Sequence, residues 1–255
     1  MSRVNFSSEV LNKSEASRLL ESPSSTRHLI TMDEAFAMAG GFGRFQFLST
    51  FILVLVYTVH GYIPYNLSYL ELQPKFTCTN STAPDPLASF PCEHDDFCTE
   101  GGARKNLELE FLPEMSDSDS LFNWTHQMEL YCISSVKMGL FGSAYFIGFF
   151  LGALCFLRFA DVYGRRKFVI AGTFIVLVAY AVIVFVNSQT VRYFMLGLLG
   201  MATAVQACIG YVLALELVPR GAQIWTGCCT HALDGLNVAF CTFYFVVISR
   251  YWEPY

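Results

Sequence analysis

Five long apolar runs separated by polar segments dominate the pattern of hydrophobic and polar positions along the chain. The runs cover about residues 45–65, 136–159, 168–186, 191–218 and 224–248. Each is near or above the roughly 20 residues that a helix needs to cross the hydrocarbon core of a bilayer. In the first run, His60, Gly61 and Pro64 interrupt the apolar pattern near its far end. The pattern predicts an all-α integral membrane protein with about five transmembrane helices.

The polar segments form a tail, one large loop and several short turns. We interpret residues 1–44 as a tail, 45–66 as the first transmembrane helix, 67–135 as the large loop and 136–255 as helices two to five. Within the tail, Thr31 followed three residues later by Glu34 resembles a capping box, so we expect a short amphipathic helix there. Gly40 and Gly41 provide its stop signal.

Charge sets the expected orientation. The short turn between the second and third runs is basic, with Arg158, Arg165, Arg166 and Lys167, and basic turns favour the cytoplasmic side. The 67–135 loop is acidic and poor in Lys and Arg. This asymmetry predicts a cytoplasmic N-terminus and an external loop. With 15% charged residues and a net charge of -5, the composition argues against nucleic-acid binding, which needs a basic face.

The loop carries residues typical of an oxidising compartment. An even number of cysteines there suggests two disulfides, for which three pairings are open: the residues are Cys78, Cys92, Cys98 and Cys132. The weaker alternative is a zinc site that includes His94, but the cysteine spacing fits no standard zinc framework. Asn80 and Asn123 lie in glycosylation acceptor sequences.

Charged residues near the basic turn form a candidate gating cluster. Its members are Asp161, Gly164, Arg165, Arg166, Glu216 and Arg220. Glu216 and Arg220 are four residues apart and can pair on one helix face, and they can also meet the Asp161–Arg165 turn. Such a cluster can hold one conformation of a membrane protein and release in another. The alternative is a solvated surface pair worth under about 1 kcal/mol.

Polar residues within the apolar runs are candidate substrate ligands. His231 and Asp234 share a helix face in the fifth run, and ionisable groups inside a membrane suggest a functional site. Asp234 would suit a cationic substrate; the alternative is a polar contact buried between helices. Gln206 and Tyr211 of the fourth run are further candidates to line a substrate cavity.

Several motifs together resemble one transporter family. Asp161-Val-Tyr-Gly-Arg-Arg166 resembles the signature loop of the major facilitator superfamily. The 40–46 segment, the cysteine-bearing loop, the Gly148 and Gly152 pair, and the run from Gly210 through Glu216 to Arg220 narrow the resemblance to its organic cation/anion transporters, solute carrier family 22. The sequence departs from the family at Leu157, where Gly is usual, and at Leu196, where the family has Arg; Arg192 lies one turn earlier.

The resemblance implies a polyspecific transporter of small organic ions in the plasma membrane. The sequence contains no nucleophile–base pair, metal-ligand set or phosphate loop that we recognise, so we expect no enzymatic activity, no metal and no cofactor. The family resemblance implies a twelve-helix protein about twice as long. The chain therefore resembles the N-terminal half of such a bundle, without the sixth helix, the central cytoplasmic loop and the second half. A complete carrier holds its substrate between two halves that alternate in access. The expected partners are therefore the lipid bilayer, the organic ion and a missing C-terminal half. The alternative is a truncated, non-transporting protein that regulates a full-length relative or acts as a surface interaction protein.

Overall fold

The computed structural model describes Glu34, Met38 and residues 42–80, 89–99, 104–105, 109–116 and 120–252. The chain divides into two units, Met1–Gly41 and Phe42–Tyr255. In the first unit only Glu34 and Met38 are described, and both are helical. The predicted amphipathic helix of the tail therefore lies almost wholly outside the described residues. The second unit is described below.

Among the described residues, five helical spans are long and apolar enough to cross a membrane, which confirms the expected all-α membrane bundle. The first contains α3 (Arg44–Val59) and α4 (Tyr62–Leu70); the second is α7 (Ser135–Tyr163); the third is α8 (Arg165–Phe185); the fourth contains α9 (Gln189–Ala204), the π-helical turn η2 (Val205–Gly210) and α10 (Tyr211–Glu216); the fifth contains α11 (Arg220–Phe243) and the π-helical turn η3 (Tyr244–Ile248). Every span begins before its apolar run, and the first two also end beyond theirs. Hydropathy marks only the hydrocarbon-crossing part of a helix, whereas helical hydrogen bonding continues into the polar interface.

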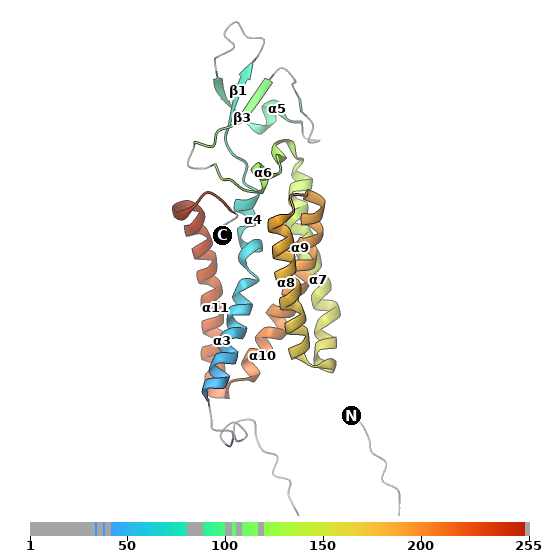
Figure 1. The fold of residues 1–255 in the computed structure, drawn as a ribbon, viewed down its shortest axis with the longest axis vertical. Coiled ribbons are helices and arrows are strands. Elements are labelled where there is room, and N and C mark those ends of the chain that lie inside the picture. The colour runs from blue at the N-terminus through green and yellow to red at the C-terminus, as the bar shows by residue number, and fades with distance from the viewer. Residues whose placement is uncertain are drawn as a thin grey trace, which may run out of the picture. The chain divides into compact units, whose positions relative to one another are not determined.

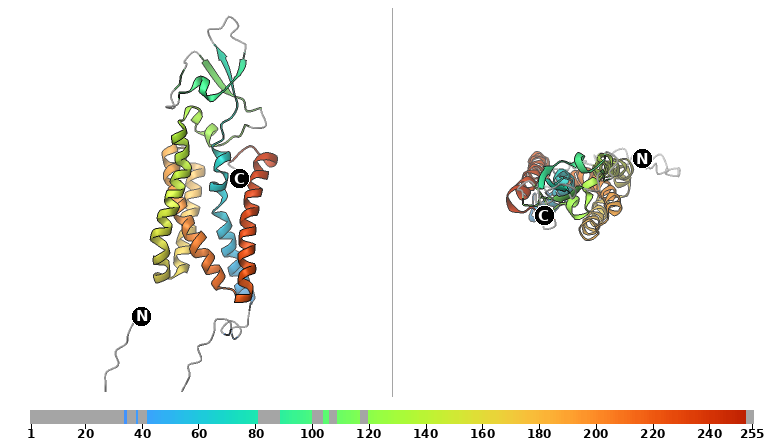
Figure 2. Two further views of the ribbon diagram at one scale, coloured as in Figure 1. Left: turned by 180° about the vertical axis from the view of Figure 1, so that it is seen from behind. Right: turned by 90° about the horizontal axis from the view of Figure 1, so that it is seen from above.

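The spans pack as two groups joined by the fourth span (Figure 1). Helices α7, α8 and α9 pack against one another, while α3 and α4 pack against α11. The fourth span belongs to both groups, because α9 contacts α7 and α8 whereas α10 contacts α3. The view from behind in Figure 2 shows α10 running obliquely beneath α9 toward α3 and α11. The π-helical turn η2 lies between these two parts of the fourth span.

Glycines set the distance between α7 and α9. A Cβ atom built on Gly148 would lie 1.9 Å from the Gly197 carbonyl oxygen, and one on Gly200 would lie 2.0 Å from the Tyr145 carbonyl oxygen. A Cβ on Gly152 would lie 2.5 Å from the Met201 carbonyl oxygen. Backbone therefore meets backbone at three levels of this helix pair. Small residues allow such close approach in membranes, where packing rather than the hydrophobic effect drives helix association.

Gly200→Ala should separate α7 from α9, because neither backbone can yield to the added methyl group. We expect the free energy of unfolding to fall by about 1–3 kcal/mol, the usual cost of overpacking. Thermal unfolding of the purified protein in detergent measures the effect. Gly139→Ala is the matched control in α7, since a Cβ atom there meets nothing within 4 Å. Equal midpoints for the two variants would contradict the packing argument.

The first span is broken at His60 and Gly61, close to where the sequence interrupts the apolar pattern. Neighbouring groups satisfy the carbonyls that the break frees. The Nδ2 atom of Asn237 donates to the Thr58 carbonyl at 3.0 Å, and the Tyr180 hydroxyl donates to the Val59 carbonyl at 3.1 Å. A break at membrane depth needs such partners, because lipid offers none. After the break the helix continues to Leu70, four residues beyond the predicted end.

The large loop contains a small antiparallel sheet that the sequence analysis did not predict. Its strand order is β2-β1-β3, with β1 (Phe76–Asn80), β2 (Ser89–Cys92) and β3 (Leu109–Pro113). The described part of the loop also contains the short helices α5 (His94–Phe97), α6 (Trp124–Gln127) and η1 (Leu130–Cys132). Phe76, Phe97 and Phe111 pack ring against ring beneath the sheet. The strands have five residues at most, which gives alternation too little length to stand out.

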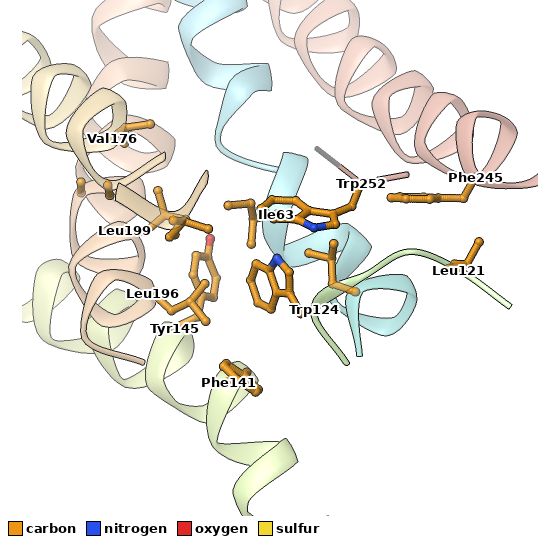
Figure 3. Close-up of a cluster of buried hydrophobic side chains, with 14 of the residues drawn as sticks. Ile63, Leu121, Trp124, Phe141, Tyr145, Val176, Leu196, Leu199, Phe245 and Trp252 are labelled. Carbon is orange, nitrogen blue, oxygen red and sulfur yellow. The ribbon is translucent and has the colours of Figure 1, made fainter. Parts of the chain in front are cut away.

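The base of the loop joins the core of the bundle. Figure 3 shows Trp124 and Trp252 facing each other beside Ile63, with Phe141 of α7 below them. Trp252 follows the fifth span and is held to the loop by backbone hydrogen bonds. The Phe122 nitrogen donates to the Arg250 carbonyl at 2.9 Å, and the Trp252 nitrogen donates to the Phe122 carbonyl at 3.3 Å. We call residues 249–252 the strap.

Candidate functional site

Arg165 joins the turn between α7 and α8 to the end of α10. Its Nε atom donates to Asp161 Oδ1 at 3.0 Å and its Nη2 atom lies 2.9 Å from the same oxygen. Its Nη1 atom donates to Glu216 Oε1. The structure thus brings together three residues of the predicted gating cluster, from two segments that lie far apart in the sequence. This charge triad lies at the end of the bundle opposite the sheet (Figure 1).

The other members of the predicted cluster lie around the triad. Arg166 is exposed and lines a cavity of about 390 Å³ together with residues such as Phe45 of α3 and Leu213 of α10. Arg220 is exposed and begins α11. Glu216, which the sequence analysis paired with Arg220, has Arg165 as its ion-pair partner.

Gly164 makes the turn that brings Arg165 into place. It ends α7 and precedes α8, with φ 99° and ψ 124°. Residues with a Cβ atom rarely adopt a positive φ, whereas glycine does so readily. The turn therefore depends on the backbone of this residue rather than on side-chain contacts, because a Cβ atom built on Gly164 would meet nothing within 4 Å.

Gly164→Ala should strain this turn through the backbone alone. We expect a stability loss of about 1–3 kcal/mol, the cost of holding a residue in a sparsely populated backbone region. Thermal unfolding measures it, with Gly221→Ala as control, since Gly221 lies within α11 and a Cβ atom built on it would also meet nothing within 4 Å. A variant that unfolds at the wild-type temperature would show that the turn tolerates a side chain.

Polar side chains from three spans meet near the middle of the bundle. The Tyr65 hydroxyl donates to Asp234 Oδ2 at 2.8 Å, which joins α4 to α11, while Asp234 Oδ1 is buried without a hydrogen-bond partner. The rings of Tyr57, Tyr211 and His231 lie within 5.4–6.1 Å of one another. Asp234 is the fifteenth of the 29 residues in the fifth span, so its carboxylate lies about halfway across. We call these five residues the midspan cluster.

Three of the four predicted cavity residues belong to the midspan cluster, and the fourth does not. Gln206 is buried between the fourth and third spans, where its Nε2 atom donates to the Thr173 hydroxyl at 3.3 Å. The sequence analysis gave Tyr65 no role. Its distance of 169 residues from Asp234 along the chain hides the contact, and only the packing of α4 on α11 reveals it.

The four loop cysteines form two disulfides, Cys78–Cys92 and Cys98–Cys132. This is one of the three pairings that the sequence left open. The first bond joins neighbouring strands, and the second ties the end of α5 to η1.

The predicted glycosylation at Asn123 conflicts with its geometry. Its Nδ2 atom, to which a glycan would be attached, donates to the carbonyls of Tyr69 and Leu72, both at 2.8 Å. The side chain is fully buried and also caps α6. The folded loop therefore leaves no room for a glycan at this residue. Asn80 ends β1, and its side chain lies outside the described parts of the structure.

Arg192 is a buried cation to which the sequence analysis assigned no role. Its side chain is 0% exposed, and Nη2 donates to Gln127 Oε1 at 2.7 Å. The guanidinium lies over the rings of Trp124 and Trp252, at 5.0 and 5.4 Å from their centroids. Its Nε and Nη1 atoms are buried without hydrogen-bond partners. Burying an unpaired charge costs several kcal/mol, and cation–π contacts return only about 2 kcal/mol each.

Glu71 is a half-buried carboxyl just beyond the first span. Burial raises the pKa of this carboxyl from 4.5 to about 7. Its Oε1 atom is buried and has no hydrogen-bond partner. Below a pH of about 7, the folded protein therefore holds Glu71 mainly in its neutral form.

The raised pKa of Glu71 predicts a stability change with pH. Below pH 4.5 the carboxyl is protonated in both the folded and unfolded chain; as the pH rises to about 7 the unfolded chain ionises first, so stability falls and then levels off. Glu71→Gln should remove this fall. Thermal unfolding from pH 4.5 to 8 measures the difference, with Glu110→Gln on the exposed side of β3 as control. A wild-type curve parallel to that of Glu71→Gln would contradict the prediction.

Comparison with known proteins adds one finding. Residues 111–224 match the family model of the Major Facilitator Superfamily. The match runs from β3 to the first turns of α11, so it includes the whole charge triad. No curated protein matches the chain. The match supports the superfamily resemblance and says nothing of the narrower organic cation/anion family.

Proposed function

We propose that the chain is the N-terminal half of a plasma-membrane transporter for small organic ions. The superfamily match over residues 111–224 supports a transporter in general. The organic-ion substrate rests on the narrower resemblance of the sequence. In this proposal the N-terminus is cytoplasmic, the disulfide-bearing loop is external, and a second set of helices completes the carrier.

The charge triad is the observation that carries the proposal. The side chains of Asp161 and Glu216 are 63% and 47% exposed. Exposed ion pairs contribute about 0–1 kcal/mol to stability, so the triad adds little to the fold. A weak pair between two helical segments is instead suited to forming in one state and breaking in another. We assign it the role of a cytoplasmic latch.

The midspan cluster supplies the substrate face in this proposal. Transporters of this kind bind substrate near the bilayer midplane, between two halves. Asp234 lies at that depth, next to hydroxyl and imidazole groups that can form hydrogen bonds with a polar ligand. An acid held halfway across the membrane is costly, which favours a functional role over a purely structural one.

Flux measurements in proteoliposomes test the proposal. We would reconstitute the chain alone and together with a fragment of an organic-ion transporter that carries its last seven helices, and measure uptake of radiolabelled tetraethylammonium and para-aminohippurate. We expect uptake of at least one probe only with both halves. Arg165→Gln should then lower the uptake rate about tenfold, a typical coupling effect, without changing substrate affinity. Lys167→Gln, in the same turn, is the charge-matched control.

Three outcomes of the flux measurements would contradict different parts of the proposal. Absence of flux with both halves present would contradict the transporter proposal and favour the non-transporting alternative. Full flux from the chain alone would contradict its role as one half. Equal uptake rates for Arg165→Gln and Lys167→Gln would contradict the latch role of the charge triad. They would leave the transporter proposal standing.

A further inference from the structure

We propose that Arg192 forms the centre of a buried binding site for a small monovalent inorganic anion, such as chloride, at the loop end of the bundle. The site is separate from the charge triad and from the midspan cluster. It does not depend on the transport proposal, because it rests on the charge and contacts of one buried side chain.

Arg192 has no negatively charged partner among the described residues. The ion pairs among the described residues lie elsewhere, and none involves Arg192. Its one hydrogen-bond acceptor, Gln127 Oε1, is neutral. Two of its three nitrogen atoms, Nε and Nη1, find no acceptor in the described parts of the chain. A buried guanidinium with no carboxylate partner and too few protein acceptors is a costly arrangement, and an anion would correct both the charge and the missing hydrogen bonds.

Arg192 also lies in the first turn of α9, where a positive side chain is unfavourable. This helix has no acidic residue in its first turn. The helix dipole places partial positive charge there, which disfavours a cation and favours an anion. The Trp124 Nε1 atom, whose indole ring lies under the guanidinium, is a further buried donor without a partner among the described residues. The local field therefore attracts negative charge from several sources.

An anion can reach this position from the polar side of the loop base. Gln127, the residue that covers the guanidinium, also lines an open cavity of about 360 Å³ with Asn187 and Gln189. A rotation of the Gln127 side chain would connect the cavity to Arg192. The guanidinium is fully buried, so a monatomic halide suits the site better than a polyatomic anion. Glu129 lines the same cavity and would oppose anion entry.

Tryptophan fluorescence can report the anion directly. The chain has three tryptophans, of which Trp124 and Trp252 flank the guanidinium, whereas Trp225 is 74% exposed on α11. We would therefore use the full chain with Trp225→Phe, in nanodiscs of zwitterionic lipid. Sodium iodide would be titrated against sodium gluconate at constant ionic strength. We expect saturable quenching by iodide, and its reversal by chloride.

Three variants distinguish iodide bound at Arg192 from collisional quenching by iodide in solution. Arg192→Gln should lose the saturable component and leave only collisional quenching, while Glu71→Gln should keep it. Glu129→Gln should lower the iodide concentration needed for half-saturation, because it removes a repelling charge. Chloride at tenfold excess over its dissociation constant should raise the Tm of the wild type by about 3–6 °C, and that of Arg192→Gln not at all.

Iodide quenching that is linear in the parent Trp225→Phe protein, and indifferent to chloride, would overturn the proposal. This outcome needs no Arg192 variant, so misfolding of Arg192→Gln cannot obscure it. Saturable quenching that survives in a folded Arg192→Gln protein would also overturn it. Neither result would affect the transport proposal, which the flux measurements address.

Discussion

The close approach of α7 and α9 is the contact on which the arrangement of the other helices depends. Lipid gives two apolar helices little reason to associate through their side chains, so contact between backbones matters more. Gly148 and Gly152 of α7, with Gly200 of α9, provide this contact at successive turns. Helix α8 packs on α9 and on the η2 turn, and so takes its place from the same pair. The charge triad in turn forms only because α8 begins close enough to the end of α10 for Arg165 to reach Glu216.

The fourth span connects this rigid pair to the rest of the bundle. Its first part is fixed by glycine contacts, and its last part packs on α3. The π-helical turn between them carries residues that contact both α7 and α8. Such turns are rare and often lie at functional positions. The Tyr211 ring, which directly follows this turn, is the contribution of the fourth span to the midspan cluster.

The sequence predicts the membrane architecture well because apolar length and basic turns depend on local composition. It also places Asp161, Gly164 and Arg165 on one turn and identifies the four loop cysteines. It does not show the sheet, whose strands are too short for a clear period, or the burial of Asn123, whose partners lie more than fifty residues away. Arg192 appears in the sequence as a charge at the end of an apolar run. Only the folded chain shows that two tryptophans from distant segments enclose it.

The strap gives the loop a mechanical connection to the fifth helix. Phe122 and Tyr251 stack at 4.3 Å between ring centroids, and two backbone hydrogen bonds run beside them. The end of the fifth span next to the loop therefore cannot tilt away without pulling the loop base with it or breaking these bonds. A conformational probe attached to the disulfide-bonded sheet would consequently register movements of a helix buried beneath it, without any label inside the membrane.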